Sequence, residues 1–255
     1  MAALADRLIE RFIVLEVALL ATRARLAART DSEALHDLRI VVRRLRSLLR
    51  PLRGLPGVET LEAATAEVGR LSSPLRDLEV LADELARCGL KAPGARRRQA
   101  LVVGYPALLA EPALARLQFC LTLWPGLLRE AEREGLLKGE RNKVHRRLLR
   151  QQQRLQVALS DPAHDRHRLR LLVKRVRYAA EVWPQQLTLE QPELLKAAQS
   201  ALGDWHDRLQ WCLRAESEAD LQPCLARWQR ELAAAEVAAD AVLLRLQQTL
   251  AGDAG

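Results

Sequence analysis

The residues best suited to chemistry occur in two copies of one basic pattern. Residues 36–46 read HDLRIVVRRLR, and 131 positions later residues 167–177 read HRLRLLVKRVR. The copies share the histidine and the basic positions that follow it by three, seven, eight and ten residues. Chance similarity between two arginine-rich helices is the simpler explanation, but the shared histidine and the similar flanking order favour an internal duplication.

On a helix, the histidine and most of the basic residues of each copy lie on one side, within an arc of about 80° in the first copy. The first stripe consists of His36, Arg39, Arg43, Arg46 and Arg50, and the second stripe of His167, Arg170, Lys174 and Arg177. Apolar residues occupy the opposite side, so each helix is expected to be anchored through them. They are Leu38, Val41, Val42, Leu45, Leu48, Leu49 and Leu52 in the first copy and Leu169, Leu172, Val173, Val176, Ala179, Ala180 and Trp183 in the second.

The positive charge of the chain is concentrated in these two segments. Residues 36–53 carry a net charge of +5 and residues 164–181 carry +4, whereas the whole chain carries +8. Like charges one helical turn apart repel each other, so the pattern is unfavourable unless acidic groups or a polyanion neutralise it. Arginine predominates, which suits bidentate binding of phosphate. A solvated basic face would explain one such helix, but two matched copies favour anion binding.

The histidines and the later acidic residues are expected to support this binding. Neighbouring arginines lower the pKa of a histidine, so His36 and His167 are expected to be neutral at pH 7 and still able to donate one hydrogen bond. About 40 residues after each copy come Asp77 and the pair Asp204 and Asp207. Catalytic and metal-binding roles are open to these aspartates, but we favour a supporting role, as partners of stripe arginines or as helix caps.

The elements that must position these residues are predicted to be helices throughout. Ala, Leu, Arg, Glu and Gln dominate the composition, and β-branched and aromatic residues are scarce, which indicates an all-α fold. Thr30-Asp31-Ser32 and Asp161-Pro162 provide start signals before the two basic helices. The predicted helices span 3–29, 33–52, 57–72, 75–88, 94–110, 112–135, 138–159, 164–183, 190–202, 205–219 and 222–250.

The duplication predicts a single domain built from two helical repeats, at about residues 1–132 and 133–255. Cys88, Cys120, Cys212 and Cys224 show no CxxC spacing, so they are expected to be reduced and mostly buried. Charged residues interrupt the N-terminal segment at every turn, and the apolar stretch 12–21 contains Glu16. No signal peptide or membrane span is therefore expected, and a cytoplasmic location is predicted.

The repeated pattern, together with residues 76–81 (RDLEVL) and 202–207 (LGDWHD), resembles the CHAD domain, the conserved-histidine α-helical domain. The resemblance extends over almost the whole chain, and residues 174–178 (KRVRY) are its most specific part. It implies two pseudo-symmetric four-helix bundles with a basic groove or pore between them that binds inorganic polyphosphate, and an association with polyphosphate granules. It places both stripes except Arg50 on the polyanion, with Arg44, Arg50, Arg175 and Tyr178 at the margin.

The two copies are not equivalent in this comparison. Ser47 occupies the position of Tyr178, and Glu181 that of Arg50, which would shorten the basic track at one end of the second copy.

Two other functions are compatible with the sequence. The dipeptide His-Asp at 36–37, 164–165 and 206–207 is compatible with a metal-dependent phosphohydrolase, but surrounding arginines would repel a divalent cation. No Walker loop or nucleophile–base pair is recognisable. The other alternative is a nonspecific nucleic-acid binder. Of nine aromatic residues only Tyr178 lies beside a stripe, so there is no stacking platform for single strands, but a basic helix could still follow phosphates nonspecifically. We therefore expect a binding protein that is not an enzyme and that needs neither cofactor nor metal.

Overall fold

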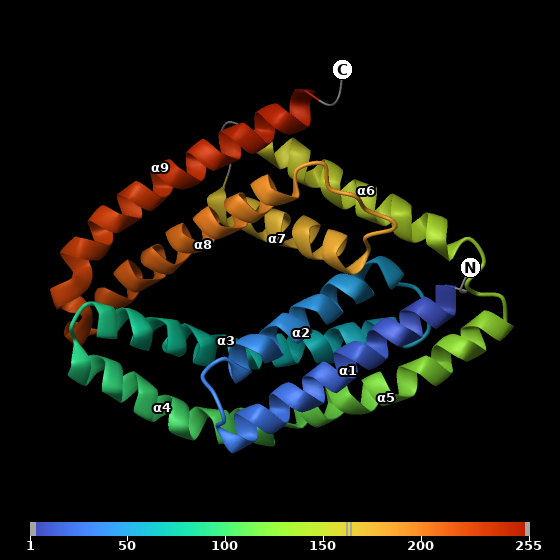
Figure 1. Cartoon of the computed structure of the whole chain (residues 1–255), viewed down its shortest axis with the longest axis horizontal. Helices are drawn as coiled ribbons and strands as arrows, with labels where there is room; N and C mark the ends of the chain where they lie inside the picture. The colour runs from blue at the N-terminus through green and yellow to red at the C-terminus, as the bar shows by residue number, and fades with distance from the viewer. Residues whose placement is uncertain (1–3, 162, 164, 253–255) are drawn as a thin grey trace. The chain divides into compact units, whose positions relative to one another are not determined.

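The computed structural model describes residues 4–161, 163 and 165–252, and these form helices joined by short connections, as Figure 1 shows. The all-α prediction is confirmed. In chain order the elements are α1 (Leu4–Ala28), α2 (Ala34–Leu49), the 3-10 helix η1 (Arg50–Leu52), α3 (Val58–Arg87), α4 (Lys91–Ala110), α5 (Pro112–Arg133), α6 (Glu140–Leu159), α7 (Arg166–Val182), α8 (Pro192–Ala215), the 3-10 helix η2 (Ala219–Leu221) and α9 (Gln222–Gly252).

The chain folds as two compact units, residues 1–145 and residues 146–255. Among the described residues, the first unit contains α1 to α5 and the first turn of α6, one helix more than a four-helix bundle. The second unit contains the rest of α6 and α7 to α9. The repeat boundary predicted near residue 132 falls at the end of α5.

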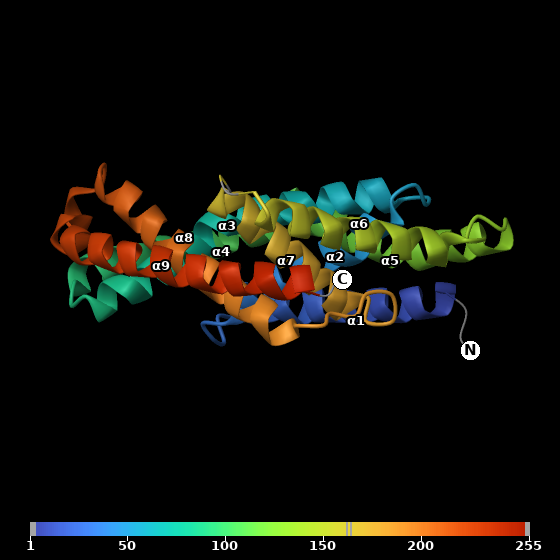
Figure 2. The same cartoon turned by 90° about the horizontal axis from the view of Figure 1, so that it is seen from above.

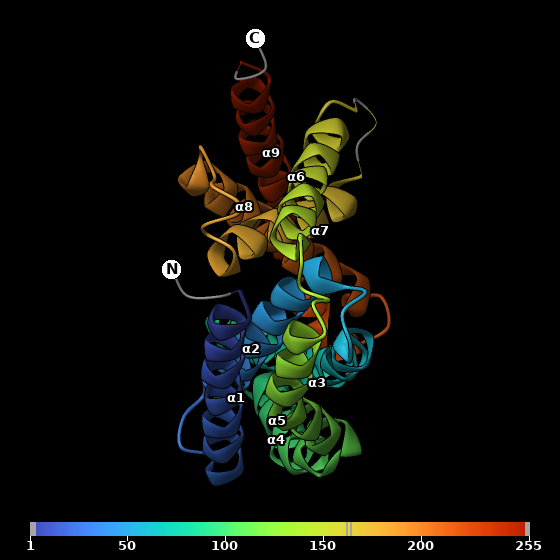
Figure 3. The same cartoon turned by 90° about the vertical axis from the view of Figure 1, so that its right-hand side faces the viewer.

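In the first unit, α2 packs between α1 and α3, while α5 contacts both α1 and α3 (Figure 3). The apolar face predicted for α2 is buried from Leu38 to Leu52, with Leu38, Leu45, Leu48 and Leu49 fully inaccessible. Burial of one continuous face fixes the rotation of α2 about its axis. The basic side of the helix is therefore held away from the core.

In the second unit, α7 is anchored through its apolar face. Leu169, Val173 and Val176 of α7 join a core to which α6, α8 and α9 also contribute. α7 packs against α8, and α8 lies along α9 (Figure 2). The predicted apolar face of α7 is buried except at Ala180, which is half-buried. Both basic helices are thus anchored in the way that their sequences predicted.

Two predicted helix breaks do not exist. Helix α3 continues through Pro74, and α8 continues through Gly203. Before Pro74 the hydroxyl groups of Ser72 and Ser73 donate hydrogen bonds to the carbonyl of Gly69, at 3.2 and 2.9 Å. Because Pro74 has no backbone N–H, this turn of the helix lacks one backbone hydrogen bond, and the two hydroxyl groups add hydrogen bonds to the same turn. A single glycine costs a helix only about 1 kcal/mol, which the buried neighbour Leu202 offsets through packing.

The start of each basic helix involves an aspartate. Asp165 caps α7, because its side chain accepts a hydrogen bond from the backbone N–H of His167 at 2.8 Å. Before α2, Asp31 accepts a hydrogen bond from the backbone N–H of Glu33 and forms an ion pair with Arg25. The start signal predicted at Asp161-Pro162 and the predicted start of a helix at His164 include residues 162 and 164, which lie outside the described residues.

The cysteine prediction is only partly right. All four cysteines are free thiols, but only Cys224 is buried, and the other three are half-buried. Within the described part of the chain, no single helix is long and apolar enough to cross a membrane; α4 and α5 meet that criterion only when taken together as a pair bent by 44°.

Candidate anion-binding site

The first stripe runs along α2 and into η1, on the side opposite the buried leucines. Arg46 and the neighbouring Arg44 are exposed to solvent. His36, Arg39 and Arg43 are half-buried, and Arg50, which begins η1, is half-buried as well. The sequence prediction that these side chains share one face of a helix anchored through its other face is confirmed for α2.

Arg39 is held by the neighbouring helix α3. Its Nη1 atom lies 3.2 Å from the carbonyl oxygen of Gly69 and 3.0 Å from each hydroxyl of Ser72 and Ser73, and it donates to all three. Burial and the charge of Arg43 lower the pKa of Arg39, while the carboxylate of Asp77 acts in the opposite direction. The guanidinium remains charged but is fixed in place, so one end of it is already occupied by the protein.

The pKa of His36 is lowered, in the direction that the sequence predicted. Burial is the largest cause, and the positive charge of Arg76 lowers the pKa further. The carboxylates of Glu33 and Asp37 act in the opposite direction. Arg76 comes from α3 and was not among the predicted site residues. Its position is fixed by Glu79, whose carboxylate oxygen lies 2.9 Å from Nη1 of Arg76.

Glu79 in turn accepts a hydrogen bond of 2.6 Å from the hydroxyl of Tyr105 in α4. Burial is the main reason why the pKa of Tyr105 is raised, and its bond to Glu79 adds to the effect. These hydrogen bonds link Arg76, Glu79 and Tyr105. They hold the Arg76 cation in place beside the first stripe through residues of α3 and α4.

The second stripe lies on α7 and is joined by a histidine from α8. The ring centroids of His167 and His206 are 5.6 Å apart. The pKa of His206 is lowered to about 4 by burial and by the charges of Arg170, His167 and Lys174, so these groups form one cluster. Among the described residues, the buried Nδ1 atom of His206 has no hydrogen-bond partner. His206 is a site residue that the sequence interpretation missed.

The far end of the second stripe is organised around Tyr178. The guanidinium of Arg177 lies over the Tyr178 ring, 4.4 Å from its centroid. Arg177 Nε donates to Gln199 Oε1 at 2.7 Å, and Gln199 donates to the Tyr178 hydroxyl at 3.4 Å. Tyr178 is only 5% exposed, so its contribution is to position Arg177.

The three supporting aspartates lie inside helices, so the predicted role as helix caps is wrong for all of them. The reason is that α3 and α8 run through the breaks expected beside them. The carboxylate of Asp77 raises the pKa of Arg39, as expected of a partner of the first stripe. Asp204 lies 4.0 Å from Arg208 of its own helix. Asp207 is half-buried in the turn of α8 that also holds His206.

Each basic helix therefore presents guanidinium and imidazole donors, and α7 an ammonium group as well, along the face opposite its buried one. These are groups that bind phosphate oxygens. Within the described residues, no three His, Cys, Asp or Glu side chains converge in a way that could hold a metal ion.

The comparisons with known proteins agree with the observed fold. The sequence model of the CHAD domain matches residues 15–216. The fold is similar to the crystal structure of the CHAD domain from the plant Ricinus communis, with a TM-score of 0.68 and 21% sequence identity over 95% of this chain and 92% of that chain. A search of curated proteins gives no match.

Proposed function

Because the chain belongs to the CHAD domain family, we propose that it binds inorganic polyphosphate through its two basic stripes without hydrolysing it. The observation that carries the proposal is the pair of matched stripes, each on a helix whose opposite face is buried. An anchored helix keeps its row of cations at fixed spacing, and a linear polyanion can follow such a row. Binding of this kind would bring the protein to polyphosphate granules.

Affinity would come from many charge-assisted hydrogen bonds and from the release of counterions. Hydrogen bonds to α3 already fix the side chain of Arg39 before any ligand binds. A side chain fixed in this way loses less conformational entropy on binding. The ligand would also neutralise the repulsion between cations one turn apart. We propose that the bound chain contacts the residues His36, Arg39, Arg43, Arg44, Arg46, Arg50, His167, Arg170, Lys174, Arg175 and Arg177.

Three residues have indirect or additional roles in this proposal. Tyr178 positions Arg177 and does not contact the ligand, because it is buried. His206 adds a donor beside His167. Arg76 adds a cation next to His36, which it already affects electrostatically.

A titration with long-chain polyphosphate tests the proposal. Removing one cation from each stripe, in Arg43→Ala/Lys174→Ala, is expected to weaken binding by about 100-fold, since each charge-assisted bond is worth about 1.5–3 kcal/mol. The matched control is Arg230→Ala/Arg245→Ala, which removes two exposed cations from α9. Equal losses in the two double variants would mean that net charge, and not the stripes, governs binding.

Two further measurements separate this function from its alternatives. Release of phosphate from polyphosphate in the presence of Mg²⁺ or Mn²⁺, at a rate dependent on the protein, would show a hydrolase and contradict the non-catalytic part of the proposal. Competition between polyphosphate and DNA at equal phosphate concentration is expected to favour polyphosphate. Equal competition would indicate a general polyanion binder.

A further inference from the structure

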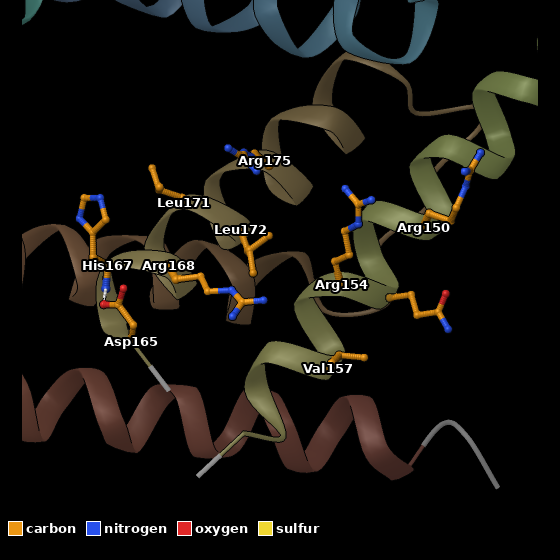
Figure 4. Close-up of a pocket in the computed structure, with 10 residues that line it drawn as sticks. Arg150, Arg154, Val157, Asp165, His167, Arg168, Leu171, Leu172 and Arg175 are labelled. Carbon is orange, nitrogen blue, oxygen red and sulfur yellow. Dashed lines mark hydrogen bonds between the residues drawn. The ribbon is translucent and has the colours of Figure 1, made fainter. Parts of the chain in front are cut away.

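The second unit contains an open cleft between α6 and α7 that is separate from most of the second stripe. Its volume is about 650 Å³, which lies within the range of small-molecule sites. Figure 4 shows Leu172 and Arg168 directed from α7 toward α6, with Arg154 standing on α6 beside them. The cleft is lined by Arg150, Gln153, Arg154, Val157, Asp165, His167, Arg168, Leu171, Leu172 and Arg175.

Four arginines give the cleft its charge. Arg150 and Arg154 lie one turn apart on α6, and Arg168 and Arg175 lie two turns apart on α7. All four are exposed, and within the described part of the chain no carboxylate is paired with Arg154 or Arg168. The acidic group of the cleft, Asp165, is already engaged as the cap of α7. The cleft therefore has an excess of positive charge that a multivalent anion would neutralise.

The position of these arginines distinguishes the cleft from the stripe. On the α7 wheel, Arg168 lies about 120° and Arg175 about 100° from Lys174, on the side of the helix that carries Leu171. The second stripe and the cleft share His167 only. A ligand in the cleft thus meets a set of cations that overlaps the set proposed to bind polyphosphate only at His167 and Arg175.

Apolar side chains are exposed among these arginines. Val157 is 65% exposed and Leu171 38% exposed, and Leu172 forms the buried floor between them. Inorganic polyphosphate has no apolar part and would leave this surface in contact with water. A flat heterocycle would cover it, and the planar guanidinium groups of Arg154 and Arg168 are suited both to stacking on such a ring and to binding phosphate.

We propose that the α6–α7 cleft binds a nucleoside polyphosphate, with the base over Val157 and Leu172 and the phosphates on the arginines. The site combines a concave apolar surface with a few convergent charged groups, which is the usual composition of a small-molecule site. The inference does not depend on the proposed function, because the cleft can bind a nucleotide whether or not the stripes bind polyphosphate.

Calorimetric titration of the full chain with ATP, tripolyphosphate and adenosine tests the proposal. We expect ATP to bind more tightly than either of the other two. Arg154→Ala and Arg168→Ala are each expected to weaken ATP binding by about tenfold, through loss of a charge-assisted contact. Val157→Ser is expected to weaken ATP by about fivefold through loss of apolar contact, while tripolyphosphate binding stays unchanged.

Matched controls exist on α9. Arg230→Ala removes an exposed arginine, and Val237→Ser changes a valine that is 72% exposed; both should leave ATP binding unchanged. The proposal is overturned if tripolyphosphate binds as tightly as ATP and Val157→Ser has no effect, since the cleft then has no base subsite. It is overturned equally if Arg154→Ala and Arg168→Ala behave like Arg230→Ala, or if ATP does not bind.

Discussion

His206 should make the stability of the protein depend on pH in a defined range. Burial and the cations of the second stripe lower its pKa to about 4 in the folded state, against 6.5 for an unperturbed histidine. Above pH 6.5 the imidazole is neutral in both states, and stability is unaffected. Between pH 6.5 and pH 4 the unfolded chain binds a proton that the folded chain does not. The free energy of unfolding therefore falls as pH falls through this range.

The size of the effect follows from the shift in pKa. With those two values, linkage gives a loss of about 2 kcal/mol between pH 7 and pH 5, which partial exposure to solvent reduces to about 1–2 kcal/mol. His206→Gln removes the proton-binding group, so the variant should lose that much less stability over the same range. A bound polyphosphate would raise the pKa of His206, because a neighbouring anion favours the charged imidazole.

Chemical denaturation of the wild type and His206→Gln at pH 7 and pH 5 gives the difference directly, and NMR titration of the His206 ring gives its pKa. Polyphosphate should raise that pKa and make the two proteins respond more alike to pH. The reasoning is refuted if His206 titrates at its ordinary value, or if both proteins lose the same stability. It also fails if polyphosphate binds and leaves the titration of His206 unchanged.

Three further outcomes are expected. Arg46→Ala should reduce the slope of log affinity for polyphosphate against log salt concentration by about 1, because one phosphate contact is lost; an unchanged slope would remove Arg46 from the site. In denaturant titrations, Gly57→Ala should destabilise the protein by about 2 kcal/mol and Gly54→Ala by about 1 kcal/mol. Both glycines have positive φ, but only at Gly57 would an added Cβ contact a side chain, at 3.0 Å. Asp165→Ala should cost about 1 kcal/mol through loss of the α7 cap, and no change in the denaturation midpoint would contradict that role.

The parts of the fold that periodicity determines could be predicted from the sequence. The buried face of α2 and that of α7 follow from the spacing of their apolar residues, and the stripes follow from the same wheel. The breaks predicted at Pro74 and Gly203 were wrong because residue preference is a weak, local signal. Hydroxyl groups before Pro74 and packing around Gly203 outweigh it.

The residues missed at the site come from other helices. His206 and Arg76 approach the stripes only because α8 packs on α7 and α3 packs on α2, and no spacing within one segment reveals such a contact. The sequence did contain a signal for these two residues, because both lie in the related segments about 40 positions after each repeat. Tyr178 likewise makes a tertiary contact, because its hydroxyl accepts a hydrogen bond from Gln199 of α8.

The central claim is that the two rows of fixed cations bind linear polyphosphate, and the dependence of affinity on chain length tests it most directly. Affinity should be measured at constant salt and compared per phosphate unit, from tripolyphosphate to chains of about 100 phosphates. We predict that it rises with length and then levels off when the stripes are filled, and that Arg43→Ala/Lys174→Ala flattens the rise. Tripolyphosphate binding as tightly as the longest chain would contradict the account.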